Sequence, residues 1–354
     1  MTTIFVTGGA GFIGSAVVRM LVAGSRYRVV SIDKLTYAGN LESLGAALDA
    51  PQHRFVQADI ADAQTMRALF DEERPAGVIH LAAESHVDRS IDAPADFIHT
   101  NVVGTFTILQ EGLRHLRRSS PADARAFRFV HVSTDEVFGS LGPTGAFSET
   151  TPYAPRSPYA ATKAAADHLA RAWFHTYGLP TITTNCSNNY GPFQFPEKLI
   201  PLAIQHALHD RPIPIYGRGE NVRDWLYVDD HARALIAVLE RGIPGESYNI
   251  GCRGERRNVD MVTAICRLLD ELSPHPTIRD RCSLITFVDD RPGHDHRYAI
   301  DMQKIHNDLG WRATESVESG LRKTVEWYIA NQAWCERVQA GTYRGERLGR
   351  GTLA

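Results

Sequence analysis

The sequence predicts an α/β fold in which a doubly wound parallel sheet is covered by helices on both faces. Three observations predict it. Apolar strand-like runs alternate with segments of helical periodicity through the first half of the 354-residue chain. These runs are too uniformly apolar to keep one face in water, which is typical of strands in a buried parallel sheet. A glycine-rich turn follows the first run, as at the start of many such sheets.

The alternation can be followed element by element. The first strand is expected in IFVTGG, the first helix in FIGSAVVRMLVAG and the second strand in RVVSID. Further strands are expected in RFVQAD, GVIHLAAE, RFVHVST and PTITTNCSN, and the helices between them in MRALFDEE, DFIHTNVVGTFTILQEGLRHL and SPYAATKAAADHLARAWFHTYG. Right-handed crossovers place the carboxyl ends of all these strands at one edge, where ligands bind in such sheets.

The regular alternation weakens after Pro192. FQFPEKLIPLAI, RPIPIYGRGENVRDW and the stretch around DDRPGHDHRY are richer in proline, glycine and charge, and they indicate a smaller, ligand-facing part. HARALIAVLERG and SYNIG are expected to return to the main sheet. We therefore expect a first domain over 1–191 with 230–252, a smaller C-terminal domain over 192–229 and 253–330, and a loose tail over 331–354.

Composition narrows the function classes. A net charge of -3 gives no electrostatic reason to expect a nucleic-acid partner or an anionic membrane. No apolar run approaches the ~20 residues that a membrane span requires, and the amino terminus carries no export signal. Five scattered cysteines without a CxxC pair suit a reducing compartment and argue against disulfides and a structural zinc site. We expect a cytoplasmic protein.

The glycine-rich turn has the spacing of a dinucleotide-binding loop. Gly8, Gly11 and Gly14 form GxxGxxG between a strand and a helix, where backbone amides and the helix terminus favour a pyrophosphate. Asp33 closes the second strand nineteen positions after Gly14, and an acid there binds ribose hydroxyls and repels a 2′-phosphate. The pattern favours a Rossmann-type sheet and NAD over NADP. Lys34 is the opposing signal, because a lysine next to the acid could accept a 2′-phosphate. The alternative is a structural glycine turn and a surface aspartate.

The stretch FRFVHVSTDEVFG ends a predicted strand in hydroxyls and two adjacent carboxylates, Thr134, Asp135 and Glu136 among them. Tyr159 and Lys163 lie one helical turn apart on one face. A nearby ammonium lowers the pKa of a tyrosine, which can then take a proton from an alcohol while hydride leaves the same carbon. The plainer alternatives are a turn-capping Asp135, a solvated Glu136 and an exposed Tyr–Lys face.

These motifs resemble a known superfamily. TGGAGFIGS, Asp33, the strand-ending hydroxyls and the Tyr159–Lys163 pair are similar to the extended short-chain dehydrogenase/reductases. STDEVFG, SPYAATKAAADHL, NCSNNYGPFQFPEKLIPL and DRPGHDHRYAID more closely resemble the dTDP-glucose 4,6-dehydratase family. The resemblance runs from residue 1 to about residue 330.

The resemblance implies a reaction for the two carboxylates. Tyr159, aided by Lys163 and Thr134, would deprotonate the C4 hydroxyl of dTDP-glucose as NAD accepts the C4 hydride. Glu136 would then remove the C5 proton while a protonated Asp135 donates a proton to the departing C6 hydroxyl, and hydride would return to C6. Such opposite roles require different pKa values. One alternative is a nucleotide-sugar 4-epimerase or decarboxylase, which needs no such pair of carboxylates. The other is a non-catalytic NAD sensor, which does not need Thr134, Tyr159 or Lys163.

The resemblance also implies the binding residues. Those expected around NAD are Gly8, Gly11, Phe12, Ile13, Gly14, Asp33, Lys34, Thr36, Asp59, Ile60, Leu81, Ala82, Ala83, Thr100, Tyr159, Lys163 and Asn189. Those expected around the sugar nucleotide are Ser85, His86, Thr134, Asn188, Lys198, Leu199, Pro214, Ile215, Tyr216, Arg223, Asn258, Arg291, His294 and Tyr298. Arg223 and Arg291 would bind the pyrophosphate, and Tyr216 would stack on the base. His294-Asp295-His296 lacks a third ligand at metal spacing, so no metal is expected.

Two helical segments indicate self-association. The segments at 95–118 and 158–177 carry apolar residues on more than one face, among them Phe106 and Trp173. Their extra apolar surface is either core or a two-fold interface. Because the equivalent helices form a dimer interface in the superfamily, we expect a homodimer.

Overall fold

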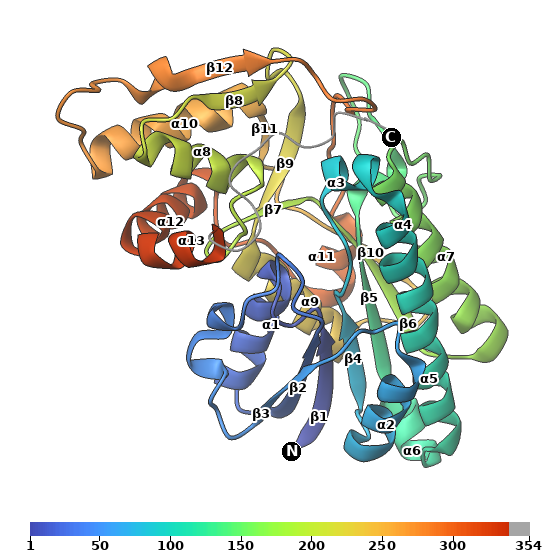
Figure 1. Cartoon of the computed structure of the whole chain (residues 1–354). Coiled ribbons are helices and arrows are strands. Elements are labelled where there is room, and N and C mark those ends of the chain that lie inside the picture. Colours follow the sequence, from blue (N-terminus) through green and yellow to red (C-terminus); the bar gives the residue numbers. More distant parts are fainter. Residues whose placement is uncertain (340–354) are drawn as a thin grey trace.

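The computed structural model describes residues 1–339, and in this part of the chain a seven-stranded parallel sheet has the order β10-β6-β5-β4-β1-β2-β3 (Figure 1). The strands are β1 (Thr2–Thr7), β2 (Tyr27–Asp33), β3 (His53–Gln57), β4 (Gly77–His80), β5 (Arg128–Thr134), β6 (Thr181–Cys186) and β10 (Ser247–Ile250). The order reverses between β1 and β4, which is where doubly wound sheets bind ligands. The predicted Rossmann-type fold is confirmed.

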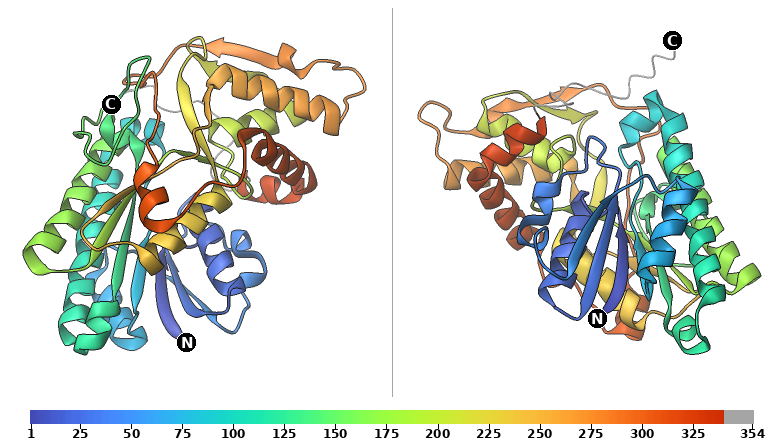
Figure 2. Two further views of the ribbon diagram at one scale, coloured as in Figure 1. Left: turned by 180° about the vertical axis from the view of Figure 1, so that it is seen from behind. Right: turned by 60° about the horizontal axis from the view of Figure 1, so that its bottom comes forward.

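Helices cover both faces of this sheet (Figure 2). One layer contains α1 (Phe12–Ala23), η1 (Leu41–Ala47), α9 (Val228–Arg241) and α11 (Gln303–Leu309), and the other contains α2 (Ala63–Glu73), α5 (Thr105–Arg118) and α7 (Pro158–Tyr177). Local signals set several ends. Asp62 caps α2, and Ser157 caps α7 ahead of Pro158, while Gly178 ends α7 in the left-handed conformation.

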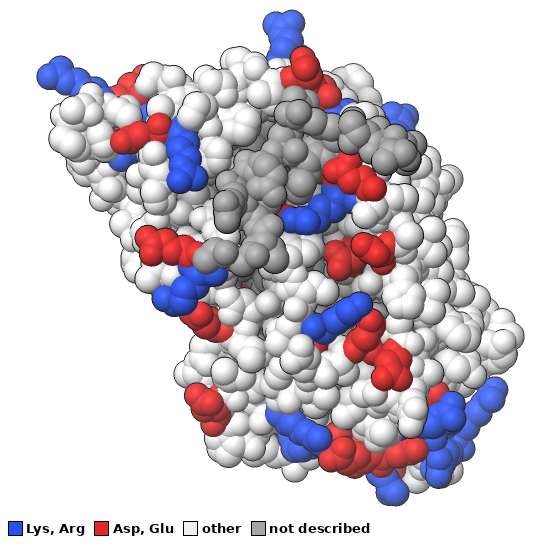
Figure 3. Space-filling view, viewed as in Figure 1, with Lys and Arg blue, Asp and Glu red and all other residues white. Residues whose placement is uncertain are grey.

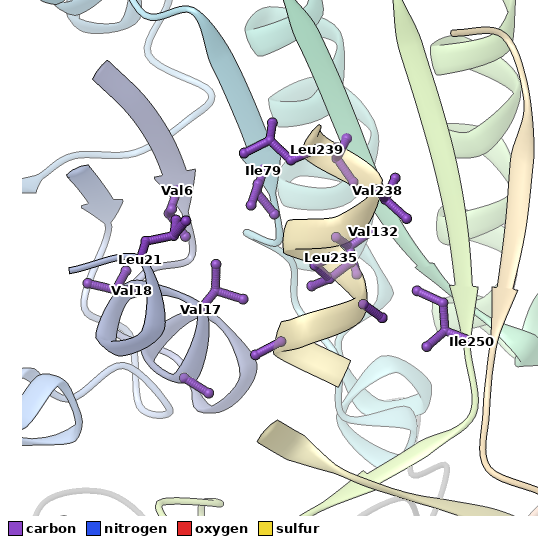
Figure 4. Packing of buried hydrophobic residues seen from close by; sticks show 14 of the residues in the cluster. Val6, Val17, Val18, Leu21, Ile79, Val132, Leu235, Val238, Leu239 and Ile250 are labelled. Carbon is purple, nitrogen blue, oxygen red and sulfur yellow. The ribbon is translucent and has the colours of Figure 1, made fainter. Parts of the chain in front are cut away.

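The first layer is held to the sheet by one continuous apolar cluster. Figure 4 shows Val17, Val18 and Leu21 of α1 beside Leu235, Val238 and Leu239 of α9. Both helices pack against sheet residues such as Val6 and Ile79, which are fully buried. Because each such side chain contributes roughly 1.5–3 kcal/mol on burial, this cluster fixes the position of the loop that precedes α1.

The long helix predicted from DFIHTNVVG onward is divided into three pieces. α4 (Pro94–Phe97) leads into η2 (Ile98–Gly104), a π-helical segment, and then into α5. A Cβ on Gly104 would lie 2.6 Å from a side-chain atom of Ile60, so the segment approaches the end of β3 closely. Amphipathic periodicity predicted the helix but did not reveal the π-helical turn. The short helices α3 (Val87–Asp92) and α6 (Pro121–Ala126) were not predicted.

The smaller part has its own core. It contains the sheets β11-β9-β7 and β12-β8 and the helices α8 (Leu199–Leu208), α10 (Asn258–Leu272), α12 (Val317–Ala330) and α13 (Gln332–Gln339). Its strands are β7 (Asn188–Tyr190), β8 (Ile213–Tyr216), β9 (Val222–Tyr227), β11 (Glu255–Arg257) and β12 (Ile285–Val288). Two short helical turns complete the described part of the chain: η3 (Asp135–Phe138) follows β5, and η4 (Arg281–Leu284) follows α10. Figures 1 and 2 show this part above the carboxyl ends of the main strands.

Two predicted boundaries need correction. Ile305, Leu309 and Trp311, which the sequence analysis assigned to the smaller domain, pack into the core beneath the main sheet. The tail predicted from residue 331 is helical as far as Gln339, because Trp334 and Cys335 are buried in the core of the smaller part. The remainder of that tail, 340–354, lies outside the described residues. The rest of the predicted division stays a proposal.

Charges of both signs are interspersed over the face shown in Figure 3. Among the described residues, no helix is both long and apolar enough to span a membrane.

Candidate active site

A cavity of about 360 Å³ opens at the carboxyl ends of the main strands, between the two parts of the chain. All seventeen residues predicted around NAD line it. From the predicted substrate and catalytic sets, Ser85, Thr134, Glu136, Asn188, Lys198 and Leu199 line it as well. The structure thus brings the two predicted sites together, because parallel strands end at one edge.

The glycine loop has the geometry that only glycine permits. Gly8 adopts φ +69°, and a Cβ there would lie 2.7 Å from the backbone nitrogen of Ala82. A Cβ on Gly14 would lie 2.0 Å from the carbonyl oxygen of Gly8. The chain can therefore turn from β1 into α1 and keep its backbone exposed to the cavity, which suits a pyrophosphate.

Asp33 braces this loop from β2. Its carboxylate accepts hydrogen bonds from the backbone amides of Ala10 (3.0 Å) and Leu35 (2.8 Å). Burial raises the pKa of Asp33, and these amide donors oppose the rise. Beside it, Lys34 forms an ion pair with Asp59 at 2.7 Å. The loop, the acid and a cavity of suitable extent fit an adenine dinucleotide with free ribose hydroxyls.

The catalytic candidates of β5 begin at its last residue. Thr134 caps the short turn η3, and its hydroxyl accepts from the amide of Glu136 (3.3 Å). The same hydroxyl lies 3.4 Å from a carboxyl oxygen of Asp135. One cap thus holds both carboxyls at the end of the strand, and Val137 and Phe138 anchor the turn in an apolar cluster.

Asp135 is in surroundings that favour its protonated form. It is 1% exposed, and its pKa is raised well above the usual value by burial first, then by the carboxylates of Glu136 and Asp224. Arg223 opposes the rise. The second carboxyl oxygen, Oδ2, is buried without a hydrogen-bond partner among the described residues. A protonated carboxyl with a free oxygen is suited to donate a proton to a ligand.

Glu136 is in different surroundings. Burial raises its pKa too, but Arg291, Lys198 and Arg223 each oppose the rise. Three cations therefore favour the ionised form of Glu136, while carboxylates disfavour that form of its neighbour. Asp295 adds to the rise at Glu136 and Arg223 acts on both acids, but the largest charge effect is carboxylate at Asp135 and cationic at Glu136. Such a difference suits an acid and base pair.

The Tyr159–Lys163 pair departs from one expectation. Lys163 was expected to lower the pKa of Tyr159, but the pKa is raised well above its usual value by burial first and by Glu136 second. A hydrogen bond with Thr134 opposes the rise. The ammonium of Lys163 donates to the carbonyl of Val132 at 2.8 Å. Lys163 thus contacts β5 directly, and its part in activating Tyr159 stays a prediction.

Only five of the fourteen predicted substrate residues line the cavity. The other nine do not, and they are His86, Pro214, Ile215, Tyr216, Arg223, Asn258, Arg291, His294 and Tyr298. Lys198 donates to the carbonyl of Ser85 (3.0 Å). Arg291 and Tyr216 both bind Asp88 of α3, at 2.8 and 2.9 Å. His294 contacts the ring of Tyr216 edge to face. Residues more than a hundred positions apart therefore close the end of the site next to Glu136, on which both Arg291 and Lys198 act.

Arg223 is tied to protein groups. Its guanidinium donates to backbone carbonyls of Asp295 (2.8 Å) and His296 (3.3 Å) and lies over the ring of Tyr298 at 4.3 Å. The hydroxyl of Tyr298 donates to the carboxylate of Asp295 (2.6 Å). Binding of a pyrophosphate by Arg223 therefore stays a prediction.

Other predicted residues are placed less directly. Ile215 is 1% exposed and packs into the core of the smaller part, so its side chain does not reach the cavity. Pro214 lies beside it on β8. His86, Asn188, Asn258 and Arg291 each have a buried polar atom without a hydrogen-bond partner among residues 1–339. Of these four residues, only Asn188 lines the cavity, where its free oxygen is consistent with a polar ligand. The described residues contain no cluster of three metal-ligating side chains.

Several residues of the site were missed by sequence reasoning. Glu197 pairs with Arg89 (3.1 Å) at the cavity wall, and only its position next to Lys198 in PEKL hinted at it. His231 of α9 is fully buried and bonds the side-chain oxygen of Asn189 (2.9 Å), which orients that amide. No local signal marks this histidine, in the first turn of an amphipathic helix, as part of a site.

Comparisons with known proteins place the chain in two steps. The fold and the cavity define an NAD-dependent enzyme class of the extended short-chain dehydrogenase/reductases. The family model described as GDP-mannose 4,6 dehydratase matches residues 5–324. The dTDP-glucose 4,6-dehydratase of Neisseria meningitidis serogroup B is 56% identical over 354 residues, covering 99% of this chain and 100% of that protein. The chain belongs to the dTDP-glucose 4,6-dehydratase family.

Solved structures agree. A dTDP-glucose 4,6-dehydratase from Streptomyces venezuelae with NAD and TYD bound has a TM-score of 0.86 and 45% identity, covering 95% of this chain and 100% of that one. One from Bacillus anthracis in complex with NAD has a TM-score of 0.84 and 42% identity, covering 96% and 100%. A UDP-glucose 4-epimerase from Thermotoga maritima still has a TM-score of 0.81 at 29% identity, covering 94% and 100%. The fold alone therefore does not separate dehydratase from epimerase.

Proposed function

We propose that this protein is an NAD-dependent lyase that converts dTDP-glucose to dTDP-4-dehydro-6-deoxyglucose and water. The observation that carries the proposal is the adjacent pair of Asp135, which is buried, and Glu136, which is partly buried, held by one cap beside Tyr159. Carboxylates are the largest charge effect on the pKa of Asp135, and cations are the largest on that of Glu136. A 4-epimerase or a decarboxylase has no use for an acid and a base at neighbouring positions of one strand end.

The glycine loop, Asp33 and the strand ends would hold NAD. When bound, NAD supplies the hydride acceptor for oxidation at C4 and the hydride donor for reduction at C6. Tyr159 accepts the proton of the C4 hydroxyl, and Thr134 stabilises the phenolate because its hydrogen bond lowers the pKa of Tyr159. Lys163, which donates a hydrogen bond to the carbonyl of Val132, contributes a positive charge one turn after Tyr159 on the same face of α7.

Elimination follows because the C4 ketone acidifies the C5–H bond. Glu136 takes the C5 proton, and the electron pair of that bond forms the C5–C6 double bond as the C6–O bond breaks. Asp135 donates its proton to the departing hydroxyl, which leaves as water. Return of a hydride to C6 and of a proton to C5 completes the reaction, so the cofactor ends oxidised and no external reductant is consumed.

The sugar nucleotide would span the cavity mouth. Lys198, Arg223 and Arg291 supply positive charge for the diphosphate. The carboxylate of Asp88 accepts a hydrogen bond from Arg291 and so orients its guanidinium. Thymidine as the base is supported by the named relatives. Uridine lacks only one methyl group, and a methyl contact is worth about 1–3 kcal/mol of discrimination.

The assembly and location belong to the same proposal. Ile98 and Val103 of η2, Phe106 of α5 and Tyr177 of α7 are exposed apolar side chains, and they support a homodimer through these segments. The five cysteines are free, which suits the reducing conditions of the cytoplasm.

The test is turnover in heavy water. The purified protein, without added reductant, is incubated with dTDP-glucose, and the sugar is followed by mass spectrometry and NMR. Loss of one water, a C4 ketone and deuterium at C5 are expected. A galactose-configured product of unchanged mass would instead make the protein an epimerase. A protein that binds NAD and leaves both dTDP- and UDP-glucose unchanged would be a sensor.

A further inference from the structure

Asp167 is a buried carboxylate behind the candidate catalytic residues. It lies on α7 one turn after Lys163 and two turns after Tyr159, so the three side chains share one face of the helix. It is 0% exposed, it does not line the cavity, and the proposed reaction gives it no role.

Four hydrogen-bond partners from three elements converge on this carboxylate. Ser133 and Tyr153 each donate to Oδ2 at 2.8 Å, and the amide of Asn185 donates to the same oxygen at 3.3 Å. The ring of His131 bonds Oδ1 at 2.9 Å through Nε2. Ser133, Tyr153 and Asn185 donate to the carboxylate, and the His131 bond depends on the ring tautomer. The carboxylate is therefore the centre of a network that joins β5, β6 and the loop before α7.

These bonds converge on the catalytic end of β5. His131 and Ser133 flank Val132, whose carbonyl receives the ammonium of Lys163. Asn185 also donates to the carbonyl of Thr134 at 3.2 Å, so it links the carboxylate to the residue that caps η3. Asp167 and Lys163 thus reach the same short stretch of strand from successive turns of α7.

Ionisable groups near Asp167 lie on several elements. Asp167 acts on Lys163 of α7, His131 of β5 and Tyr153 of the loop before α7, and Arg171 also acts on Tyr153. His80 of β4 and Cys186 of β6 interact with Lys163. Burial lowers the pKa of both histidines and Lys163 lowers them further, while Asp167 opposes the fall at His131. Burial also raises the pKa of Tyr153, which stays a phenol. Among these groups, Lys163 is the cation bonded to β5.

We propose that Asp167 is a positioning residue: its carboxylate bonds His131 and Ser133 on either side of Val132, to which Lys163 donates, and so joins the end of β5 to α7. It thereby places a negative charge behind the ammonium without a direct ion pair and holds Thr134 and Tyr159 where the sugar hydroxyl is oxidised. The inference rests on the proposed C4 oxidation for its catalytic consequence. The charge relation between Asp167 and Lys163 is independent of that reaction.

The kinetic test compares Asp167→Asn with Tyr153→Phe. Burial lowers the pKa of Lys163 and Asp167 opposes this, so removing the charge lowers the pKa of Lys163 further. In Asp167→Asn we expect the high-pH loss of kcat to begin at least about one pH unit lower than in the wild type. KM for dTDP-glucose should stay within about twofold, because Asp167 does not touch the cavity. Tyr153→Phe removes one bond and keeps the charge, so its profile should not move.

An NMR titration of Lys163, which requires no turnover of substrate, tests this inference separately from the proposed function. The chain has five lysines, so the Cε signal of Lys163 can be assigned in the NAD-loaded, ¹³C-lysine-labelled protein by its loss in Lys163→Met. Its titration midpoint should fall in Asp167→Asn and stay in place in Tyr153→Phe. An unchanged midpoint in Asp167→Asn would overturn the inference even if dTDP-glucose is turned over, and a shifted midpoint would support it even if no sugar reacts.

The double variant addresses loss of folding. If Asp167→Asn does not fold, Lys163→Met/Asp167→Asn should recover soluble folded protein, because the buried cation is removed together with the carboxylate charge. Failure of the double variant to recover would overturn the charge relation. Asp230→Asn is the matched control. Asp230 is also 0% exposed and accepts the amides of Thr314 and Glu315, so its loss should lower stability without shifting the Lys163 midpoint.

Discussion

Asp135 and Glu136 are neighbours in sequence, yet their surroundings differ at the level of single charges. Asp135 is buried and Glu136 is partly buried, and desolvation raises both pKa values. Asp135 has carboxylates nearby, which add to its rise, whereas cations reduce the rise at Glu136. These charges favour the protonated form of Asp135 and oppose that of Glu136, as an acid–base pair for elimination requires.

Asp135→Asn and Glu136→Gln should slow elimination by about 10²–10⁴-fold, the usual contribution of a general acid or base. Oxidation at C4 should be retained in part, since Tyr159 is untouched. Stopped-flow absorbance of bound reduced nicotinamide would then show it accumulating in the Glu136→Gln protein. Equal loss of oxidation and elimination in both variants would mean that the carboxyls act on binding instead.

The pH dependence of elimination follows from the same shifts. As pH falls through the raised pKa of Glu136, the base becomes protonated and the rate falls. As pH rises through the raised pKa of Asp135, the acid loses its proton and the rate falls again. We therefore expect a bell-shaped profile for the wild type whose acidic limb is absent from the residual activity of Glu136→Gln. A wild-type rate that keeps rising with pH would contradict a protonated Asp135.

At the scale of elements, α1 can lie close to β1 and β4 only because the turn between β1 and α1 has glycines, which carry no side chain. The turn before α1 brings backbone against backbone, since a Cβ on Gly14 would meet the Gly8 carbonyl at 2.0 Å. That oxygen belongs to the turn itself and cannot move without displacing it. The same helix is fixed from behind by α9, so the element has no room to shift away.

Gly14→Ala should therefore distort the loop, with a stability loss of about 1–3 kcal/mol, as for other overpacked sites, and should reduce the NAD that copurifies with the protein. Thermal unfolding and the NAD content after acid release measure the two effects. Gly142→Ala is the matched control, because a Cβ at Gly142 meets nothing within 4 Å. Full NAD content in Gly14→Ala would show that the loop does not hold the cofactor.

At the scale of the whole molecule, the exposed apolar side chains are not scattered evenly. Among the described residues, four of the seven large exposed apolar side chains, Ile98, Val103, Phe106 and Tyr177, belong to the η2–α5 and α7 segments. Trp173 joins two of them, with edge-to-face contacts to Phe106 (5.8 Å) and Tyr177 (5.3 Å). We call Ile98, Val103, Phe106 and Tyr177 the apolar strip. A group of exposed apolar side chains on neighbouring helices indicates a protein interface.

Phe106→Glu should shift the protein toward a monomer, since it places a charge in the strip. Light scattering at micromolar concentration measures the mass. Phe287→Glu is the matched control, because Phe287 is even more exposed, at 58% against 45%, and lies on β12 in the smaller part. A wild-type monomer would refute the dimer, and equal dissociation by both variants would place the contact elsewhere.

The sequence by itself determined the features that depend on local chemistry. Strand and helix periodicity predicted the parallel sheet, and the glycine loop with Asp33 predicted a dinucleotide cavity whose seventeen expected residues all line one space. Thr134, Asp135 and Glu136 were found because they are contiguous at a strand end. Topology then brought these short motifs together, since parallel strands present their carboxyl ends on one edge.

Only the tertiary structure decided the contacts between residues far apart in the chain. Asp88 binding Arg291, Lys163 turning to Val132, and the four partners around Asp167 join elements whose separation no local pattern reports. The burial of Trp334 likewise turned a predicted loose tail into a helix as far as Gln339. The physical reason is that burial and charge depend on what packs against a side chain, which the whole fold sets.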